Sequence, residues 1–248
     1  MPIYEDDAIV LRQYPIADSD SIIVSIAPEL GKIRAVAQGI KKPKNRLTSC
    51  LEPLNHIRIT LYAREGRDLA RVQNAELVHS YSGKIDSLNH IFTFEYFAEL
   101  VQTLAQDNQS NPVMFRLLLA SLKAGEKKVP IQPLIRYFEI WCLKISGLYP
   151  HYDYCSACGK YVKDVGFFAL VQEGLARCIQ CGQRNGIFIG AAASKALQAM
   201  MTLAPDAFAS QQIEEETCMQ LEKLTQGLLE MHIESSMKSY KVLKGILE

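Results

Sequence analysis

The sequence lacks any long apolar run. No uninterrupted apolar stretch among its 248 residues approaches the ~20 residues that a membrane-spanning helix needs. The first residues carry acidic side chains instead of a basic segment followed by an apolar one, so they do not read as an export signal. Without export, the seven cysteines are not expected to form a disulfide framework. We therefore expect a cytoplasmic protein with no membrane partner.

Recognisable catalytic motifs are also missing. The chain contains no G-x-x-x-x-G-K-[ST] phosphate loop, no G-x-S-x-G nucleophile motif and no H-E-x-x-H metal motif. It has no excess charge either, because 27 basic side chains balance 27 acidic ones. Asp18 and Asp20 could bind a metal and so leave a nuclease open as an alternative, although their turn-like context favours solvated carboxylates. The sequence favours a protein that is not an enzyme.

The first 82 residues have the pattern of a small β-domain. Short runs rich in Ile and Val alternate with turn signals, and no amphipathic helix intervenes. The runs predict five strands, at Ala8–Leu11, Ile22–Ile26, Ile33–Ala37, Ile57–Tyr62 and Leu69–Val72. Five short strands favour a small barrel or sandwich, and the five-stranded OB-fold is one such barrel that also binds nucleic acid.

Residues 83–248 change to the longer period of helices. Apolar side chains from Ile85 to Leu104 are too dense for one stripe, so this segment predicts a largely buried helix. Further helices are expected at Pro112–Gly125, Pro130–Gly147, Ala191–Leu203 and Glu214–Ile233. We therefore predict an α+β protein of two domains: a five-stranded OB-like β-barrel over residues 1–82, and a helical bundle over residues 83–248 that contains a Cys₄ zinc module at about 150–187.

Four of the cysteines form two C-x-x-C pairs. Cys155 and Cys158 make the first pair and Cys178 and Cys181 the second, with residues 159–177 between them. This spacing is typical of a tetrahedral Cys₄ zinc site, because a two-residue spacer lets one tight turn present both thiolates to one metal. Four thiolates leave no open coordination position for water, so we expect one structural Zn²⁺ per chain rather than a catalytic ion.

Two further features support the zinc hypothesis. Gly159 and Gly182 follow the second cysteine of each pair, and a glycine can take a positive φ that turns backbone N–H groups towards the sulfurs. Between the pairs, Phe167–Leu170 predicts a strand of a zinc ribbon. Redox-active thiols are the alternative, but the thioredoxin-like βαβ setting that they would need is absent.

The densest basic segment follows the second predicted strand. Residues 31–48 contain no acidic side chain and hold six cations: Lys32, Arg34, Lys41, Lys42, Lys44 and Arg46. Lys32 and Arg34 alternate with apolar residues, so both should face away from the core. Such a segment is either a solvated turn or a surface that contacts nucleic-acid phosphates. Tyr14, Tyr62 and Tyr81 are candidate stacking platforms beside it.

The order of these features resembles the RecO family. The segments that carry the similarity are Ala8–Tyr14, Asp18–Val24, Gly31–Gly39 and Lys41–Arg46 near the start, and Leu228–Glu234 and Met237–Leu243 at the end. The first segments are similar to the opening strands of the family, and the last to its C-terminal helix with a Lys-Ser signature. The Cys₄ cluster falls where zinc-bearing members carry theirs. The similarity extends, in order, over nearly the whole chain.

The resemblance implies an OB-fold, a helical bundle, an embedded zinc module and a non-enzymatic activity in DNA repair and recombination at the nucleoid. RecO-type proteins bind single- and double-stranded DNA, anneal complementary strands, and act with RecR to load RecA onto DNA coated by single-strand-binding protein. They also bind the acidic C-terminal tail of that coating protein. In this chain, the six cations are the candidate DNA-binding residues. Arg116 and Arg136 are candidates for the tail because each has an apolar helical context, and the alternative for each is a surface arginine that covers its own helix.

One further alternative remains open. A zinc-ribbon and OB protein that binds RNA or a protein partner in transcription or translation would have the same composition of domains. A preference for RNA over DNA in a binding assay would favour that interpretation.

Overall fold

The computed structural model describes residues 3–16, 18–42, 45–62, 69–82, 87–182, 186–233 and 237–247. The chain forms two compact units. The first consists of Met1–Leu122 together with Met237–Glu248, and the second of Lys123–Ser236. Among the described residues, no helix has both the length and the apolar character needed to cross a membrane.

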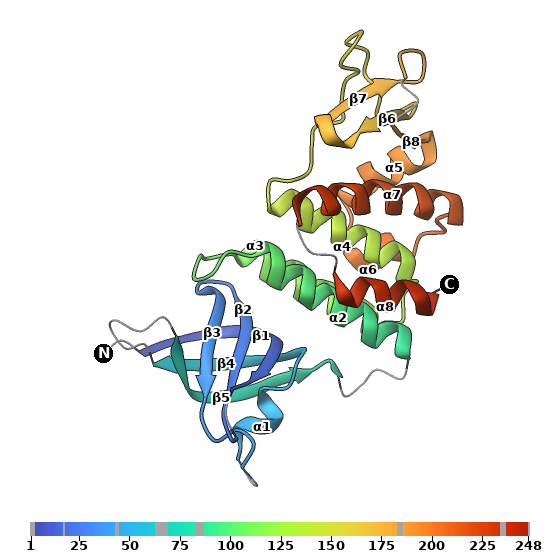
Figure 1. Ribbon diagram of the computed structural model, residues 1–248. Coiled ribbons are helices and arrows are strands. Elements are labelled where there is room, and N and C mark those ends of the chain that lie inside the picture. The colour runs from blue at the N-terminus through green and yellow to red at the C-terminus, as the bar shows by residue number, and fades with distance from the viewer. Residues whose placement is uncertain are drawn as a thin grey trace. The chain divides into compact units, whose positions relative to one another are not determined.

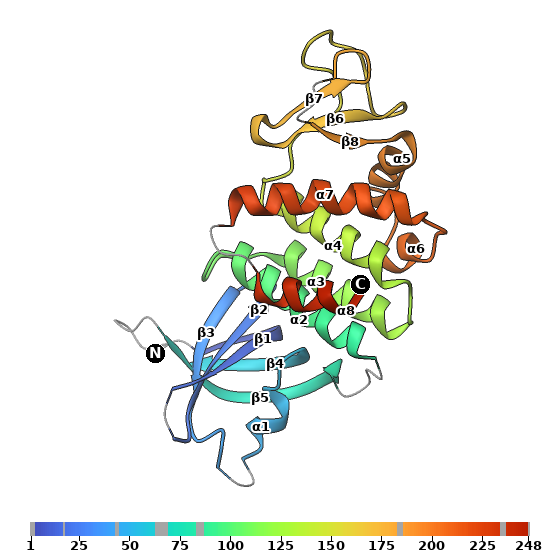
Figure 2. The same cartoon turned by 45° about the vertical axis from the view of Figure 1, so that its right-hand side comes forward.

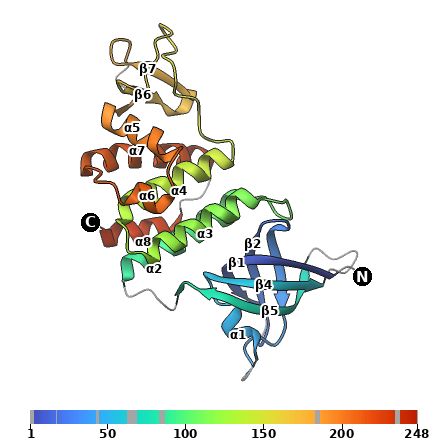
Figure 3. The same cartoon turned by 180° about the vertical axis from the view of Figure 1, so that it is seen from behind.

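Five strands form a closed barrel in the first unit. They are β1 (Ile3–Pro15), β2 (Ser21–Ala27), β3 (Gly31–Ala37), β4 (Asn55–Tyr62) and β5 (Ala70–Ser80), with a short helix, α1 (Leu47–Cys50), between β3 and β4. Around the ring the order is β1-β2-β3-β5-β4, and β4 pairs back with β1. All pairings are antiparallel except that of β3 with β5. Figure 3 shows β1, β4 and β5 crossing one face of the barrel. The OB-like barrel predicted from the sequence is confirmed.

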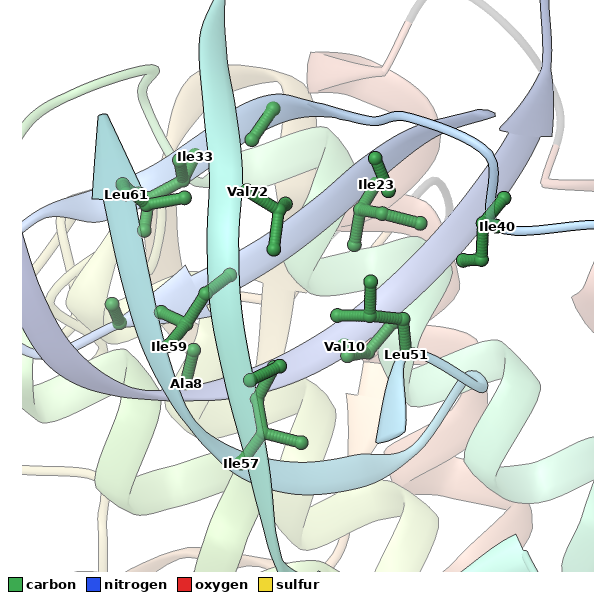
Figure 4. Packing of buried hydrophobic residues seen from close by; sticks show 14 residues of the cluster. Ala8, Val10, Ile23, Ile33, Ile40, Leu51, Ile57, Ile59, Leu61 and Val72 are labelled. Atoms are coloured by element: carbon green, nitrogen blue, oxygen red, sulfur yellow. The ribbon is translucent and has the colours of Figure 1, made fainter. Parts of the chain in front are cut away.

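Aliphatic side chains from the strands fill the barrel (Figure 4). In β4, Ile57, Ile59 and Leu61 lie inside and are at most 2% exposed, because every second side chain of a strand faces the same way. Ile40 and Leu51, on either side of α1, belong to the same core. Burying one such side chain stabilises the fold by about 1.5–3 kcal/mol, so a shift of one residue in register would be costly.

Besides α1, the described residues of the first unit contain all or most of three longer helices: α2 (Leu88–Leu104), α3 (Pro112–Glu126) and α8 (Lys238–Leu247). The prediction of a largely buried α2 is confirmed, since it packs against β1, β2 and α8 (Figure 1). The backbone N–H and the hydroxyl of Ser239 both donate to the Glu99 carboxylate. The rings of Tyr96 and Tyr240 lie 5.1 Å apart. These contacts attach the last helix of the chain to α2.

The second unit combines helices with a small sheet. Its elements are α4 (Ile131–Ile145), β6 (Phe167–Leu170), the 3₁₀-helix η2 (Val171–Glu173), β7 (Leu175–Cys178), β8 (Ile187–Ile189), α5 (Ala191–Met200), α6 (Pro205–Ala209) and α7 (Glu215–His232). The sheet has the order β7-β6-β8, and both of its pairings are antiparallel. Helix α4 packs against α6 and α7, and α7 also contacts β8 and α5 (Figure 2). The strand predicted at Phe167–Leu170 is present as β6.

The compact units do not divide at residue 82, where the sequence pattern changes. Helices α2 and α8 and most of α3 belong with the barrel. The physical reason is that α2 buries its apolar side chains against β1 and β2, and α8 in turn packs on α2. The change of period marks where helices begin, and it does not show which elements pack together.

Candidate metal centre and nucleic-acid interface

The four clustered cysteines come from two turns. Cys155 and Cys158 lie in a turn before β6, whereas Cys178 ends β7 and Cys181 follows it. The first turn lies alongside β7, because the Ser156 N–H donates to the carbonyl of a β7 residue at 2.8 Å. Although 19 residues separate the pairs in sequence, all four Sγ atoms lie within 4.8 Å of one another.

The sulfur geometry fits a tetrahedral metal. Sulfur ligands at about 2.3 Å from such an ion lie roughly 3.8 Å from one another. The Sγ atoms of Cys158 and Cys178 are 3.7 Å apart. The four cysteines could therefore hold a metal ion, and four sulfur donors leave no coordination position for a reacting water.

The pKa shifts of these thiols also favour a metal site. Burial opposes the ionisation of Cys155, but hydrogen bonds from the backbone N–H groups of Cys178, Cys158 and Ala157 lower its pKa to about 6. The Cys181 N–H, 3.4 Å from the Cys178 sulfur, lowers the pKa of Cys178. Hydrogen bonding to Cys178 and Cys158 raises the pKa of Cys181 to about 12. Two thiols thus ionise readily and another keeps its proton until a cation compensates the charge.

Gly159 and Gly182, which follow the two C-x-x-C pairs, are required for different structural reasons. Gly159 has a φ of +70°, as expected, and its N–H donates to the Cys155 carbonyl at 2.8 Å. Gly182 is not among the glycines with positive φ in the described residues. A Cβ at this position would lie 2.6 Å from ring carbons of Phe168. The expectation for Gly182 is corrected: the close approach of an aromatic ring requires glycine there.

The basic loop, which we define as residues 39–46, is anchored to the barrel. The Asp20 carboxylate accepts a hydrogen bond from the Gly39 N–H at 2.8 Å, and this bond, followed by that from Ser19, lowers the pKa of Asp20. The Asn45 amide donates to the Gly39 carbonyl at 2.7 Å, and its oxygen accepts from the Leu47 N–H at 2.9 Å. Asp20 therefore holds the loop in place, which argues against the role in metal-dependent cleavage considered for it from the sequence.

The loop presents its cations to solvent. Lys41, Lys42 and Arg46 are exposed, whereas Lys44 lies outside the described residues. Arg71 of β5 is also exposed, and it is close enough to Asp20 to help lower the pKa of that carboxyl. Arg71 could not be identified from the sequence, because its position beside the loop depends on the parallel pairing of β5 with β3.

The two cations on β3 differ from each other. Both face Asp107, which lies 3.1 Å from the Lys32 ammonium and 3.5 Å from the Arg34 guanidinium, so the prediction that they share a side is confirmed. However, Lys32 is only 7% exposed, and its ammonium also donates to the Gln102 carbonyl at 2.8 Å. The DNA-binding role expected for Lys32 is corrected, because the loop that follows α2 covers it. Arg34 remains half exposed.

The candidate stacking residues also differ in how far their rings are exposed. Tyr81 is 1% exposed and packs against His79, so it offers no face to a base. Tyr14 is 37% exposed, and its hydroxyl accepts a hydrogen bond from Gln102 at 2.7 Å. The Arg12 guanidinium lies 5.5 Å from the centre of the Tyr14 ring. Tyr14 with Arg12 is thus an available aromatic and cationic surface on β1, and no pattern in the sequence indicates this role for Arg12.

Comparison with known proteins gives the family. A family model described as "Recombination protein O N terminal" matches residues 1–81, and one described as "Recombination protein O C terminal" matches residues 87–241. This chain belongs to the RecO family. A similar protein, "DNA repair protein RecO" of Koribacter versatilis, is 30% identical over 246 residues, which cover 96% of this chain and 97% of that protein. A protein of the same name from Geobacter metallireducens is 29% identical over 97% of this chain and 96% of its own length.

Membership of the RecO family indicates a function in DNA repair and recombination, with DNA and the recombination machinery as partners. It also bears on Arg116 and Arg136, the residues expected to contact a partner. Arg116 is exposed on α3, as is Val113 one turn earlier. Arg136 is 2% exposed, and its Nη1 lies 3.2 Å from the Glu139 carboxylate. The surface role expected for Arg136 is corrected, because a RecO partner cannot reach a guanidinium that is buried and paired inside the second unit.

Proposed function

We propose that this RecO-family protein is a non-enzymatic mediator of DNA repair and homologous recombination that works in the cytoplasm at the nucleoid. It binds single- and double-stranded DNA, anneals complementary strands, and helps RecR load RecA onto DNA coated by single-strand-binding protein. The observation that carries the DNA-binding part is the basic loop. Its exposed cations project from a backbone that Asp20 and Asn45 hold against a closed barrel.

Annealing needs a surface of this kind. Two complementary strands repel each other through their phosphates, and cations that neutralise both strands remove that barrier while the base edges stay free to pair. Lys41, Lys42 and Arg46 are exposed in the loop, and Arg34 and Arg71 extend the positive surface over β3 and β5. Contacts to phosphates alone carry no sequence preference, as a protein that anneals any pair of strands requires.

The metal ion is proposed to be Zn²⁺, one per chain, held by Cys155, Cys158, Cys178 and Cys181 in a structural role. Zinc is supported by the four clustered sulfurs, by the 3.7 Å separation of the Cys158 and Cys178 sulfurs, and by the backbone N–H groups directed at them. When bound, the ion would join the turn before β6 to the end of β7. This chain's own residues then need only hold the ion and exclude water from it.

The acidic C-terminal tail of single-strand-binding protein is proposed to dock on the helices, with Arg116 at its binding site. An acidic peptide with an apolar end needs a cation beside an apolar surface. Arg116 and Val113 provide both on one exposed face of α3. Replacing Arg116 by alanine should weaken binding of the tail peptide, and a variant that binds the peptide normally would remove Arg116 from the proposal.

The salt dependence of DNA binding tests the role of the basic loop. Replacing Lys41, Lys42 and Arg46 by alanine should flatten the log–log salt slope for single-stranded DNA by about 2, at roughly 0.7 per phosphate contact. Annealing should slow in parallel, with metal content and folding unchanged. The matched control removes three exposed lysines from other parts of the chain: Lys123, Lys195 and Lys223. Equal slopes for the two triple variants would show that DNA does not run along the loop.

A second assay addresses the alternatives. Annealing of strands coated with single-strand-binding protein should occur with this chain, and incubation with Mg²⁺ alone should cut neither strand. Tighter binding to RNA than to DNA of the same sequence would instead favour a role in transcription or translation. Cleavage of DNA that disappears on changing Asp18 would support the nuclease alternative.

A further inference from the structure

A cavity of about 300 Å³ lies within the second unit. Its lining combines aromatic and cationic side chains from the segment before β6 with residues of α5, and includes Lys144, Tyr149, Tyr152, Lys163, Phe167 and Gln198. None of these residues is a metal ligand, and none belongs to the basic loop. The volume is at the small end of the ~300–1,000 Å³ that is usual for small-molecule sites.

Aromatic rings form one wall of the cavity. The Tyr152 and Phe167 rings lie 5.4 Å apart at an interplanar angle of 31°. The Tyr149 ring meets Tyr152 edge-on at 5.8 Å, at 81°. Tyr152 and Phe167 are at most 3% exposed and pack on each other, whereas Tyr149 is partly exposed. The Tyr149 ring is therefore the one that can stack on a flat aromatic ligand.

The Tyr152 hydroxyl needs a hydrogen-bond partner. Tyr152 is 3% exposed, and its hydroxyl has no partner among the described residues. Buried polar groups in folded proteins are nearly always satisfied, so an unpaired one that lines a cavity indicates a polar atom of a ligand or a water. Burial raises the pKa values of Tyr149 and Tyr152, so both phenols stay protonated and can donate.

The charge of the cavity favours an anion. The Lys144 ammonium stands 5.7 Å from the centre of the Trp141 ring and 5.9 Å from that of Tyr149. In the described part of the chain, the Lys144 ammonium donates to the Met201 thioether at 2.9 Å, and a thioether is a weak acceptor. Asp153 is already paired with Lys163 at 2.5 Å. Lys144 therefore remains able to bind a phosphate.

We propose that this cavity binds one unpaired nucleotide of single-stranded DNA. The base stacks on the Tyr149 ring, the Tyr152 hydroxyl donates to the edge of the base, and the phosphate binds Lys144. An acidic peptide with an aliphatic side chain would match the charge, and its carbonyl oxygens could accept from the Tyr152 hydroxyl, but it has no flat ring to stack on Tyr149. The choice of ligand rests on the proposed DNA binding, but the residues involved are separate from the basic loop.

Trp141 provides the readout. It is the single tryptophan of the chain, and Lys144 lies over its ring, so a phosphate at Lys144 should change its fluorescence. The probe is a 5′-phosphorylated thymidine dinucleotide, added to the full chain with its metal. The control probe is the corresponding abasic dinucleotide, which has the same charge. We expect saturable binding that is about 5- to 150-fold tighter for the thymidine probe, because stacking is worth roughly 1–3 kcal/mol per base.

Two conservative variants locate the site. Tyr152→Phe removes only the hydroxyl and should weaken the thymidine probe about 2- to 12-fold, as the loss of one hydrogen bond does. The matched control is Tyr154→Phe: this tyrosine is 62% exposed, packs on Tyr161 and does not line the cavity. Metal content should be unchanged in both variants, which shows that the module remains folded.

Three results would overturn the inference: no response of Trp141 to the thymidine probe, equal affinity of the Tyr152→Phe and Tyr154→Phe variants, or a response to an acidic peptide with none to the nucleotide. The triple alanine variant of the basic loop separates this inference from the proposed function. It should lose the binding of long single strands and keep the binding of the dinucleotide. If long strands bind and the dinucleotide does not, the inference fails while the proposed function stands.

Discussion

Arg136 allows a direct test of whether a cation in an apolar helix serves the surface or the interior. Its guanidinium Nη1 lies 3.2 Å from the Glu139 carboxylate, which is fully buried. The same carboxylate accepts hydrogen bonds from the Thr225 hydroxyl at 2.6 Å and from the Gln226 amide at 2.8 Å. The perturbation is Arg136→Met, which keeps much of the side-chain volume and removes the charge.

The expected cost follows from the burial. Without Arg136, Glu139 keeps two neutral donors but loses its compensating charge in an interior that excludes water. Breaking a buried ion pair from one side typically costs about 3–5 kcal/mol. Removing both charges in Arg136→Met with Glu139→Leu should recover most of that loss, because no buried charge remains. The Thr225 hydroxyl can then use the Glu222 carbonyl, which lies 3.2 Å away.

The assay is equilibrium unfolding in urea, followed by the fluorescence of Trp141, which lies on the same helix as Arg136. We expect a large loss of unfolding free energy for the single variant and a small one for the double variant. A single variant that loses less than about 1 kcal/mol would refute the reasoning, since exposed pairs are worth that little. A stable single variant that no longer bound the tail of single-strand-binding protein would show instead that Arg136 contacts this partner.

Three further predictions concern other parts of the chain. Replacing Cys158 by serine should abolish stoichiometric metal binding and raise hydrogen exchange in the β6–β8 sheet, as measured by mass spectrometry, because a folded Cys₄ site depends on all its ligands. Replacing Asp20 by alanine should free the Gly39 N–H, speed its hydrogen exchange and weaken DNA binding. In the parent chain the pKa of Asp20 is lowered, so the hydrogen bond to Gly39 is fully present above pH 3.8 and is lost as the pH falls through the lowered pKa. The Gly39 amide resonance would report that loss. Replacing Glu99 by alanine removes the acceptor at the start of α8 and should raise hydrogen exchange there about fivefold, corresponding to roughly 1 kcal/mol for a lost cap.

Features encoded by neighbouring residues could be predicted from the sequence. The cysteine spacing predicted which four cysteines come together, because each C-x-x-C pair is made within one turn, and the strand at Phe167–Leu170 follows from the same local pattern. The barrel strands were recognised by their apolar cores but were predicted too short. β5 continues to Ser80, beyond the predicted end at Val72, because residues with polar side chains still pair with β4.

Features that depend on distant segments could not be predicted. Lys32 is buried by Asp107 and Gln102, which are at least 70 residues away, and no periodicity in β3 indicates that contact. Arg136 is satisfied partly through Thr225, 89 residues later. The Lys-Ser signature gave no role for Ser239, which only the packing of α8 on α2 brings to Glu99. In each case, a polar side chain that looked available is the partner of a group far along the chain.

The same distinction explains how a chain with no net charge can offer a DNA-binding surface. The sum of 27 basic and 27 acidic side chains counts pairs such as Arg136 with Glu139 and Lys32 with Asp107, where at least one charge is buried and neither partner attracts DNA at a distance. The field that a phosphate meets is set by the balance of exposed charges at the surface that it approaches. In the basic loop the Asp20 carboxylate accepts a hydrogen bond from the Gly39 N–H, and the exposed cations around it outnumber it: Lys41, Lys42, Arg46 and Arg71. DNA affinity should therefore follow the basic loop and its neighbours on β3 and β5, and it should be insensitive to the net charge of the chain.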